Sequence, residues 1–259
     1  MPLISSENVR PNARRRCGAA ISLLAILSLL GVGTLSGAQA AVAQPALCIA
    51  EPCFEPDDYS IDEADSLWVV VNKQRPLSNL KYLPANLVKP AFAKPRTNNP
   101  YGLVLAKPAA DAFVGLVAAA KKAGAGDIFM QSAYRSYNYQ VSVHSSAVAR
   151  LGLKAGEALA ARPGHSEHQT GLAVDVAAVG QGCTIQVCFG TTRAGRYLAK
   201  YAYKYGFIIR YPNGKTSITG YQYEPWHLRY VGVGLATEMR SQGFSVLEDF
   251  WALEPAPNY

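Results

Sequence analysis

The stretch RPGHSEHQTGLAVDV, residues 162–176, contains two of the four histidines of the chain together with one aspartate. From Gly171 onward the residues alternate in the manner of a β-strand, in which successive side chains point to opposite faces. The two faces would carry Leu172, Val174 and Val176 on one side and Ala173, Asp175 and Ala177 on the other. A carboxylate buried among alanines is costly unless it has a partner. The pattern therefore predicts that Asp175 binds either a metal ion or an arginine.

A second segment, EPWHLRYVG (residues 224–232), places Glu224 three residues before His227. Pro225 disfavours a helix interior, and in a straight strand the two side chains would point to opposite faces. We therefore expect a bend at Pro225 that aims both side chains at one point, while alternate residues pack in the core, namely Trp226, Leu228 and Tyr230. A core histidine beside a surface glutamate is the alternative for this segment taken alone.

Together the two segments predict one catalytic zinc ion bound by His168, Asp175 and His227, with a fourth position open for water. Zinc lowers the pKa of its bound water to about 7. Glu224 would not bind the metal. It would accept the proton of the water during attack and later donate it to the leaving amine.

The segment SAYRSYNYQ (residues 132–140) places Arg135 at the end of a predicted strand. Hydrolysis of an amide needs a group that stabilises the developing oxyanion, and a fixed guanidinium would serve. A solvated arginine at a strand–helix turn is the alternative for this segment alone.

Helices and mostly antiparallel strands alternate along the chain without an internal repeat, which predicts a single α+β domain with a central, mainly antiparallel sheet flanked by helices. The proline-rich stretch 81–101 is expected to be a loop. Periodicity and turn residues predict strands at 66–77, 127–135, 171–179, 207–212 and 225–232, and helices at 108–124, 136–152, 154–162, 192–206, 234–243 and 245–253.

The first 40 residues have the pattern of a secretory signal peptide: three arginines, an apolar run and a small-residue cleavage site after Ala40. Cleavage after Ala43 and an uncleaved membrane anchor are the alternatives. We expect an exposed lead-in at 41–66, the catalytic domain at 67–253 and a tail at 254–259. The predicted location is outside the cytoplasm, secreted or at the cell wall, with no stable membrane association once the signal is cleaved.

The charge of the chain gives no indication of nucleic-acid binding. The whole sequence has 25 basic and 18 acidic residues, a net charge of +7. Residues 1–40 carry four of these arginines and one glutamate, which leaves 21 basic and 17 acidic residues, or +4. No stripe of lysine and arginine is present, so we expect no nucleic-acid partner.

Four of the five cysteines lie beyond the predicted signal peptide, and an even number in an exported chain indicates disulfides. Four cysteines allow three pairings. The two C-x4-C spacings favour two local bonds, Cys48 with Cys53 and Cys183 with Cys188. A zinc knot of four thiolates is the alternative.

Three segments, SAYRSYNYQ, PGHSEHQTGLAVDV and EPWHLRYVG, resemble the VanY-type zinc D-alanyl-D-alanine carboxypeptidases, part of a peptidase group that includes D-Ala-D-Ala dipeptidases. WVVVNKQRPL is similar to the opening strand of that family. The resemblance extends from about residue 67 to about residue 250. It implies a D-Ala-D-Ala peptidase, or hedgehog-like, fold in which an antiparallel sheet carries the metal.

The resemblance implies a role for each site residue. His168, Asp175 and His227 would bind zinc, Glu224 would be the general base, and Arg135 would stabilise the tetrahedral intermediate. Ser166, Gln140 and Tyr134 would hold the peptide or its terminal carboxylate. His165 would lie at the edge of the cleft and His144 would have a structural role.

The expected activity is removal of the terminal D-Ala from peptidoglycan stem peptides ending in D-Ala-D-Ala, by a monomeric enzyme. A D,D-dipeptidase or a cell-wall endopeptidase of the same fold is the alternative, because loops 81–101 and 212–223 shape the cleft. A non-catalytic wall-binding module would be expected to lack a ligand or the base, and this sequence has all of them.

Overall fold

A four-stranded antiparallel sheet lies at the centre of the computed structural model, which describes residues 54–259. The strand order is β3-β4-β6-β5. The strands are β3 (Ile128–Ser132), β4 (Ala173–Ala178), β5 (Phe207–Ile209) and β6 (His227–Tyr230). The predicted α+β architecture with an antiparallel sheet is confirmed.

Two helices cover one face of this sheet, α2 (Lys107–Lys122) and α5 (Arg193–Tyr201). Phe113 of α2 and Leu198 of α5 belong to the same buried cluster as Val174 of β4 and Leu228 of β6. The same cluster contains Val176 and Ala178 of β4 and Leu172 just before it, so alternate side chains enter the core as the alternation predicts. The opposite face of β4 is therefore free to carry polar side chains.

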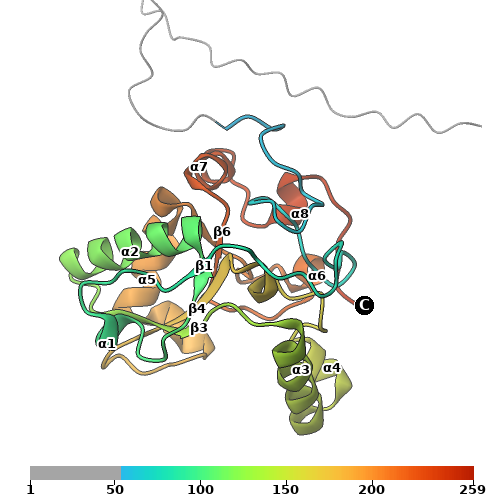
Figure 1. Ribbon diagram of the computed structural model, residues 1–259, viewed down its shortest axis with the longest axis horizontal. Coiled ribbons are helices and arrows are strands. Elements are labelled where there is room, and N and C mark those ends of the chain that lie inside the picture. Colours follow the sequence, from blue (N-terminus) through green and yellow to red (C-terminus); the bar gives the residue numbers. More distant parts are fainter. Residues whose placement is uncertain (1–53) are drawn as a thin grey trace, which may run out of the picture. The chain divides into compact units, whose positions relative to one another are not determined.

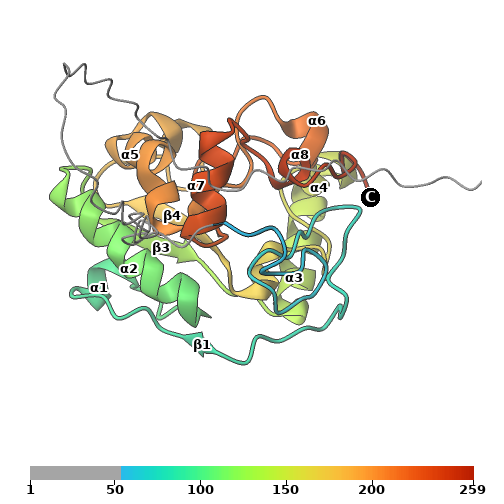
Figure 2. The same cartoon turned by 90° about the horizontal axis from the view of Figure 1, so that it is seen from above.

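The helices α3 (Tyr137–Leu151) and α4 (Leu153–Glu157) lie side by side, at the other end of the domain from α2 and α5 (Figures 1 and 2). The Ser136 hydroxyl caps α3 by accepting a hydrogen bond from the Tyr139 amide. His144 Nε2 lies 3.5 Å from Glu157 Oε1, so this histidine connects the two helices. That placement agrees with the structural role expected of His144.

Shorter elements connect these parts of the fold. The predicted helix at 192–206 divides into α5 and η3 (Ala202–Tyr205), which ends at Gly206 with a φ of 77°. The remaining elements are β1 (Leu87–Val88), α1 (Pro95–Asn98), β2 (Leu105–Ala106), η1 (Glu167–Thr170), η2 (Val187–Thr191), α6 (Thr216–Thr219), α7 (Val233–Ser241) and α8 (Leu247–Phe250).

The strand predicted at 66–77 is not formed, so that prediction is wrong. Alternate side chains do enter two clusters: Trp68 and Val70 pack with α7 and α8, and Val69 and Val71 pack with Leu77. The backbone has no ladder partner; the Val70 amide bonds to the Ile61 carbonyl instead. Alternating burial alone therefore produced the strand pattern.

Segments at both ends of the described chain pack onto the domain. Phe54, in the predicted lead-in, lies 5.2 Å from Trp68 between ring centroids. In the predicted tail, Ala256 is fully buried and its amide bonds to the Ile218 carbonyl at 2.7 Å. The predicted signal peptide lies outside the described residues. Among residues 54–259, no helix has both the length and the apolar character needed to cross a membrane.

A disulfide joins Cys183 to Cys188 with an S–S distance of 2.11 Å, the local pairing that the spacing favours. Two of the four thiolates needed for a zinc knot are therefore not available. Cys48 and Cys53, the other predicted pair, lie outside the described residues.

Candidate zinc site and active-site cavity

Three buried side chains converge at the polar face of the sheet. His168 lies in η1, Asp175 in the middle of β4 and His227 at the start of β6. Strands β4 and β6 are neighbours, and their register pairs Asp175 with His227. One ligand atom from each of the three residues lies within 4.8 Å of the other two. The structure therefore brings together the three ligands predicted from the sequence.

The separations between these atoms fit a metal site. His168 Nε2 lies 3.2 Å from Asp175 Oδ2, and His227 Nδ1 lies 3.0 Å from Asp175 Oδ1. These distances run to different oxygens of Asp175, and each is close to the separation of about 3.4 Å between tetrahedral ligands at zinc distances of about 2.0–2.1 Å. His168 Nε2 and Asp175 Oδ1 are also buried without a hydrogen bond to another described residue. Two imidazole nitrogens and a carboxylate oxygen form a ligand set that suits zinc.

Gly171 makes the sharp reversal that brings His168 close to Asp175. It ends η1 with a φ of +70°, in the left-handed region that favours glycine. A Cβ at this position would lie 2.9 Å from the backbone nitrogen of Ala106. Backbone conformation and crowding therefore both require glycine here.

The expected bend at Pro225 is present. The His227 amide donates to the Glu224 carbonyl at 3.1 Å, which closes a turn just before β6. Trp226 and Leu228 enter the core, while His227 faces the site. The turn places Glu224 Oε2 3.8 Å from His227 Nδ1. Glu224 thus lies beside the three ligands.

Burial and neighbouring charges shift the pKa values of the two histidines in opposite directions. Burial and the Arg135 charge lower the pKa of His168 to about 4, which leaves this imidazole neutral. Burial also opposes the charge on His227, but the neighbouring carboxylates of Asp175 and Glu167 raise its pKa to about 9. The carboxyl of Asp175 is kept ionised, because the neighbouring histidines outweigh burial and hold its pKa well below the usual value.

The pKa of Glu224 is shifted in the opposite direction from that of Asp175. Its side chain is 5% exposed, and burial raises its pKa to about 8. It makes no salt bridge to a lysine or arginine in the described part of the chain. A carboxyl whose pKa lies near the operating pH can both accept and donate a proton.

The guanidinium of Arg135 is held by three side chains. It donates to Ser132 Oγ at 2.9 Å, to Gln140 Oε1 at 3.0 Å and to Asp175 Oδ2 at 2.9 Å. Both partners that the sequence left open for Asp175, a metal site and an arginine, therefore lie beside it. Arg135 also lines the cavity next to the ligands.

The structure gives no support for the expected contact of Gln140 with substrate. Its side chain is fully buried, and both ends of the amide are already engaged, with Arg135 and with the Ala161 carbonyl at 2.8 Å. It is not among the residues that line the cavity. Gln140 instead fixes the orientation of Arg135.

The remaining predicted residues divide between the cavity and its surroundings. Ser166 lines the cavity, as a substrate contact must. Tyr134 does not line it, so the structure gives no support for its expected contact with substrate. His165 does not line it either; its Nδ1 lies 2.9 Å from the Asn72 carbonyl, and its ring packs against Tyr259.

The cavity has a volume of about 500 Å³ and opens to solvent. One wall comes from α3, through Tyr139, Ser142, Val143, Ser146 and Arg150. Ile185, in the loop that the disulfide closes, and Tyr211 also line it. The Tyr211 ring packs on His227 at 4.9 Å between centroids. A short peptide can therefore reach the metal ligands, Glu224 and Arg135 from one opening.

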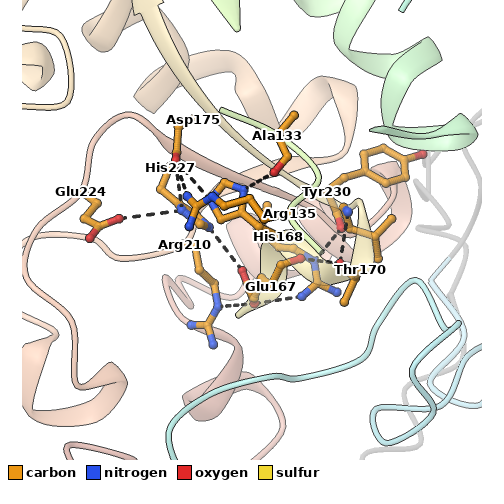
Figure 3. Close-up of polar contacts among 12 residues, drawn as sticks. Ala133, Arg135, Glu167, His168, Thr170, Asp175, Arg210, Glu224, His227 and Tyr230 are labelled. Atoms are coloured by element: carbon orange, nitrogen blue, oxygen red, sulfur yellow. Dashed lines mark hydrogen bonds and ion pairs between the residues drawn. The ribbon is translucent and has the colours of Figure 1, made fainter. Parts of the chain in front are cut away.

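Sequence reasoning missed Glu167, which lies beside His227 on the side away from Glu224 (Figure 3). It also missed the two arginines that hold Glu167, Arg210 and Arg229. One signal was present: Arg229 follows His227 by two residues on a strand, so it belongs to the same face as the ligand. Nothing local to Glu167 indicates its partners.

Comparison with known proteins agrees with this geometry. A family model described as VanY, D-alanyl-D-alanine carboxypeptidase, matches residues 102–233. The chain is 39% identical over 191 residues to the YodJ protein of Bacillus subtilis (strain 168). This match covers 74% of this chain and 69% of that protein.

Solved structures of similar proteins have the same fold. The LdcB LD-carboxypeptidase is 39% identical, with a TM-score of 0.64 over 73% of this chain and 87% of that one. VanYB in complex with D-alanine-D-alanine is 31% identical, with a TM-score of 0.59, and the match covers 71% of this chain and 96% of that chain. A VanY D,D-pentapeptidase in complex with Zn(II) is also 31% identical, with a TM-score of 0.59, and the match covers 73% of this chain and 99% of that chain.

Proposed function

The chain belongs to the VanY family of D-alanyl-D-alanine carboxypeptidases, and on this premise we propose that it is an exported, zinc-dependent enzyme that removes the terminal D-Ala from peptidoglycan stem peptides. The observation that carries the proposal is the convergence of His168, Asp175 and His227 beside Glu224 in one open cavity. A zinc-bound VanY and a VanYB complex with D-Ala-D-Ala are among the similar structures, which supports the metal and the substrate class.

Each side chain has a part in the proposed reaction. A bound zinc ion would supply a water of lowered pKa and polarise the scissile carbonyl. Glu224 takes the proton from the attacking water and delivers it to the leaving amine. Arg135, pre-oriented by Ser132 and Gln140, donates hydrogen bonds to the oxyanion. Because its guanidinium is already fixed, little reorganisation accompanies the reaction.

Export is part of the proposal and rests on the signal-peptide pattern of residues 1–40. The Cys183–Cys188 disulfide supports it, because disulfides persist in oxidising compartments. A protein at this location meets peptidoglycan, the material that contains D-Ala-D-Ala termini. Fractionation of the producing cells, with an antibody against the domain, checks this location.

A second candidate is an L,D-carboxypeptidase, which removes a D-residue that follows an L-configured centre. The observation that favours it is the similarity to the LdcB LD-carboxypeptidase, whose 39% identity and TM-score of 0.64 exceed the values for VanYB. The same ligands and base would perform either reaction, since both hydrolyse a peptide bond next to a terminal carboxylate.

Mass spectrometry of defined stem peptides separates these candidates. We expect the protein to remove one alanine from a pentapeptide ending in D-Ala-D-Ala, and strong chelators to abolish this activity. Release of alanine from the tetrapeptide alone would favour the L,D-carboxypeptidase. Turnover of free D-Ala-D-Ala alone would contradict both and indicate a dipeptidase.

The role of Glu224 is tested by Glu224→Gln. Since general acid–base catalysis contributes about 10²–10⁴-fold, we expect kcat to fall by a factor in that range while zinc content is unchanged. Zinc content is measured by atomic emission on the same preparations as a control. Activity equal to that of the wild type would remove Glu224 from the mechanism.

A further inference from the structure

Glu167 lies in η1, immediately before the ligand His168, and its side chain is fully buried. Its Oε1 accepts one hydrogen bond from Arg210 Nε and one from Arg229 Nη1, each at 2.8 Å. Its Oε2 accepts none from the described residues. A buried polar atom without a hydrogen bond is unusual in a folded protein. Pairing with the two arginines therefore does not by itself explain the position of Oε2.

The free oxygen faces one ring nitrogen of a predicted zinc ligand. Glu167 Oε2 lies 3.5 Å from His227 Nε2, which is also buried and has no hydrogen bond to another described residue. The other ring nitrogen, Nδ1, faces Asp175 Oδ1 at 3.0 Å and Glu224 Oε2 at 3.8 Å. The imidazole thus lies between Glu167 on one side and the metal site on the other (Figure 3).

This arrangement selects one tautomer. A histidine that binds a metal must be neutral, and a neutral imidazole carries one N–H and one lone pair. Glu167 Oε2 can only accept a hydrogen bond, so the N–H belongs on Nε2 and the lone pair of Nδ1 points toward the metal position. His168 has the reverse arrangement, since its Nδ1 lies 2.7 Å from the Ala133 carbonyl and its Nε2 faces Asp175.

The partners of the two ligands also differ in charge. His168 is oriented by a neutral backbone carbonyl, whereas His227 faces a carboxylate. A carboxylate behind a metal-bound histidine raises the basicity of the ligand and fixes its ring orientation. We propose that Glu167 is a positioning residue, which holds His227 in the Nε2-protonated tautomer so that Nδ1 binds the metal. This inference rests on the proposed zinc site.

Glu167 is itself held rigidly. Arg210 makes two further bonds to Glu248, at 2.7 and 2.9 Å. Arg229 is fixed by the carbonyls of Leu67 and Tyr230, at 2.9 and 3.0 Å. Two glutamates and two arginines therefore form a buried cluster of balanced charge, which we call the Glu167 cluster. Within it only the carboxylate of Glu167 lies at ion-pair distance from the His227 ring.

The experiment compares two isosteric substitutions, each of which removes one negative charge from the Glu167 cluster. Glu167→Gln replaces an acceptor with an amide that can donate to Nε2, which favours the wrong tautomer. Glu248→Gln is the matched control, since Glu248 contacts Arg210 but not His227. Zinc affinity is measured by competition with a chromophoric chelator, and the absorption spectrum of the Co(II) form reports the ligand field.

We expect Glu167→Gln to weaken zinc binding by about 10–100-fold and to change the Co(II) spectrum, while Glu248→Gln keeps the wild-type spectrum. Equal effects of both substitutions, or none, would overturn the inference. Heteronuclear NMR of isotope-labelled histidines in the wild-type zinc form provides a test that needs no variant. A His227 ring protonated at Nδ1 in that form would contradict the proposal.

Failure of this inference can be distinguished from failure of the proposed function. Failure of the wild-type protein to bind zinc would refute the zinc site and this inference together. A wild-type protein that binds zinc but cleaves no stem peptide would refute the activity, while the zinc affinities of the two variants would still test Glu167.

Discussion

At the scale of single residues, the site depends on side chains that do not touch the reacting atoms. Arg135 provides the only guanidinium that contacts Asp175 among the described residues. It can serve an oxyanion only if its orientation is fixed, and Gln140 supplies one of the fixing bonds. If Gln140 orients Arg135, its substitution should change kcat, whereas loss of a substrate contact should change KM.

Gln140→Met keeps the length of the side chain and removes both of its hydrogen bonds. We expect kcat to fall by about 10- to 100-fold, because a small misplacement of a catalytic group has an effect of this size, with a smaller change in KM. The unpaired Ala161 carbonyl and Arg135 should also lower the free energy of unfolding by about 1–3 kcal/mol. Steady-state kinetics on the stem peptide, with urea denaturation, measures both. A higher KM at unchanged kcat would restore Gln140 as a substrate contact.

At the scale of elements, the path from η1 into β4 sets the distance between His168 and Asp175. The Gly171 carbonyl accepts a hydrogen bond from the Ala106 amide at 2.9 Å, so β2 lies directly against the reversal. Any displacement of this turn would move one ligand relative to the other. Packing around a single glycine thus links a short two-stranded sheet to the candidate metal site.

Gly171→Ala tests this element, and Gly180→Ala is its matched control. Both glycines have positive φ values, 70° and 68°, but an added Cβ at Gly180 would meet nothing within 4 Å. We expect each substitution to cost about 1–2 kcal/mol of conformational strain, and Gly171→Ala about 1–3 kcal/mol more through overpacking. Urea denaturation gives both values. Equal losses would show that crowding against Ala106 is unimportant.

At the scale of the whole molecule, the Glu167 cluster joins segments that are far apart in the sequence. Glu248 of α8 accepts from Asn72 Nδ2 at 3.0 Å as well as from Arg210, which follows β5. Burial alone would raise the pKa of Glu248, but the charge of Arg210 outweighs burial and lowers it. A carboxyl with a lowered pKa stabilises the fold above its unfolded pKa, and this stabilisation is lost as the pH falls through the folded pKa.

Glu248→Gln should therefore change the pH dependence of stability. At neutral pH we expect a loss of about 3–5 kcal/mol, because a buried arginine loses one partner. The difference from the wild type should shrink as the pH falls below about 4, near the unfolded pKa of glutamate. Both proteins have the same metal ligands, so the pH dependence of metal binding cancels in this difference. A difference that is constant with pH would contradict the prediction.

Much of the fold and of the candidate site could be predicted from local patterns. The alternation after Gly171 correctly predicted which side chains of β4 enter the core. The Pro225 argument correctly predicted a bend that places Glu224 beside His227. The same alternation failed at 66–77, where the side chains alternate between two clusters but no strand lies alongside. Periodicity reports burial, and it does not report backbone pairing.

By itself the sequence determined which residues are the candidate ligands, His168, Asp175 and His227, the faces of their strands and the turns beside them, because these properties arise between neighbouring residues. Only the tertiary structure decided which ring nitrogen of each histidine faces Asp175, that Gln140 contacts Arg135, and that Glu167 lies beside His227. Those contacts join residues from separate segments of the chain. Their distances follow from how the sheet, η1 and the helices pack, which no local pattern contains.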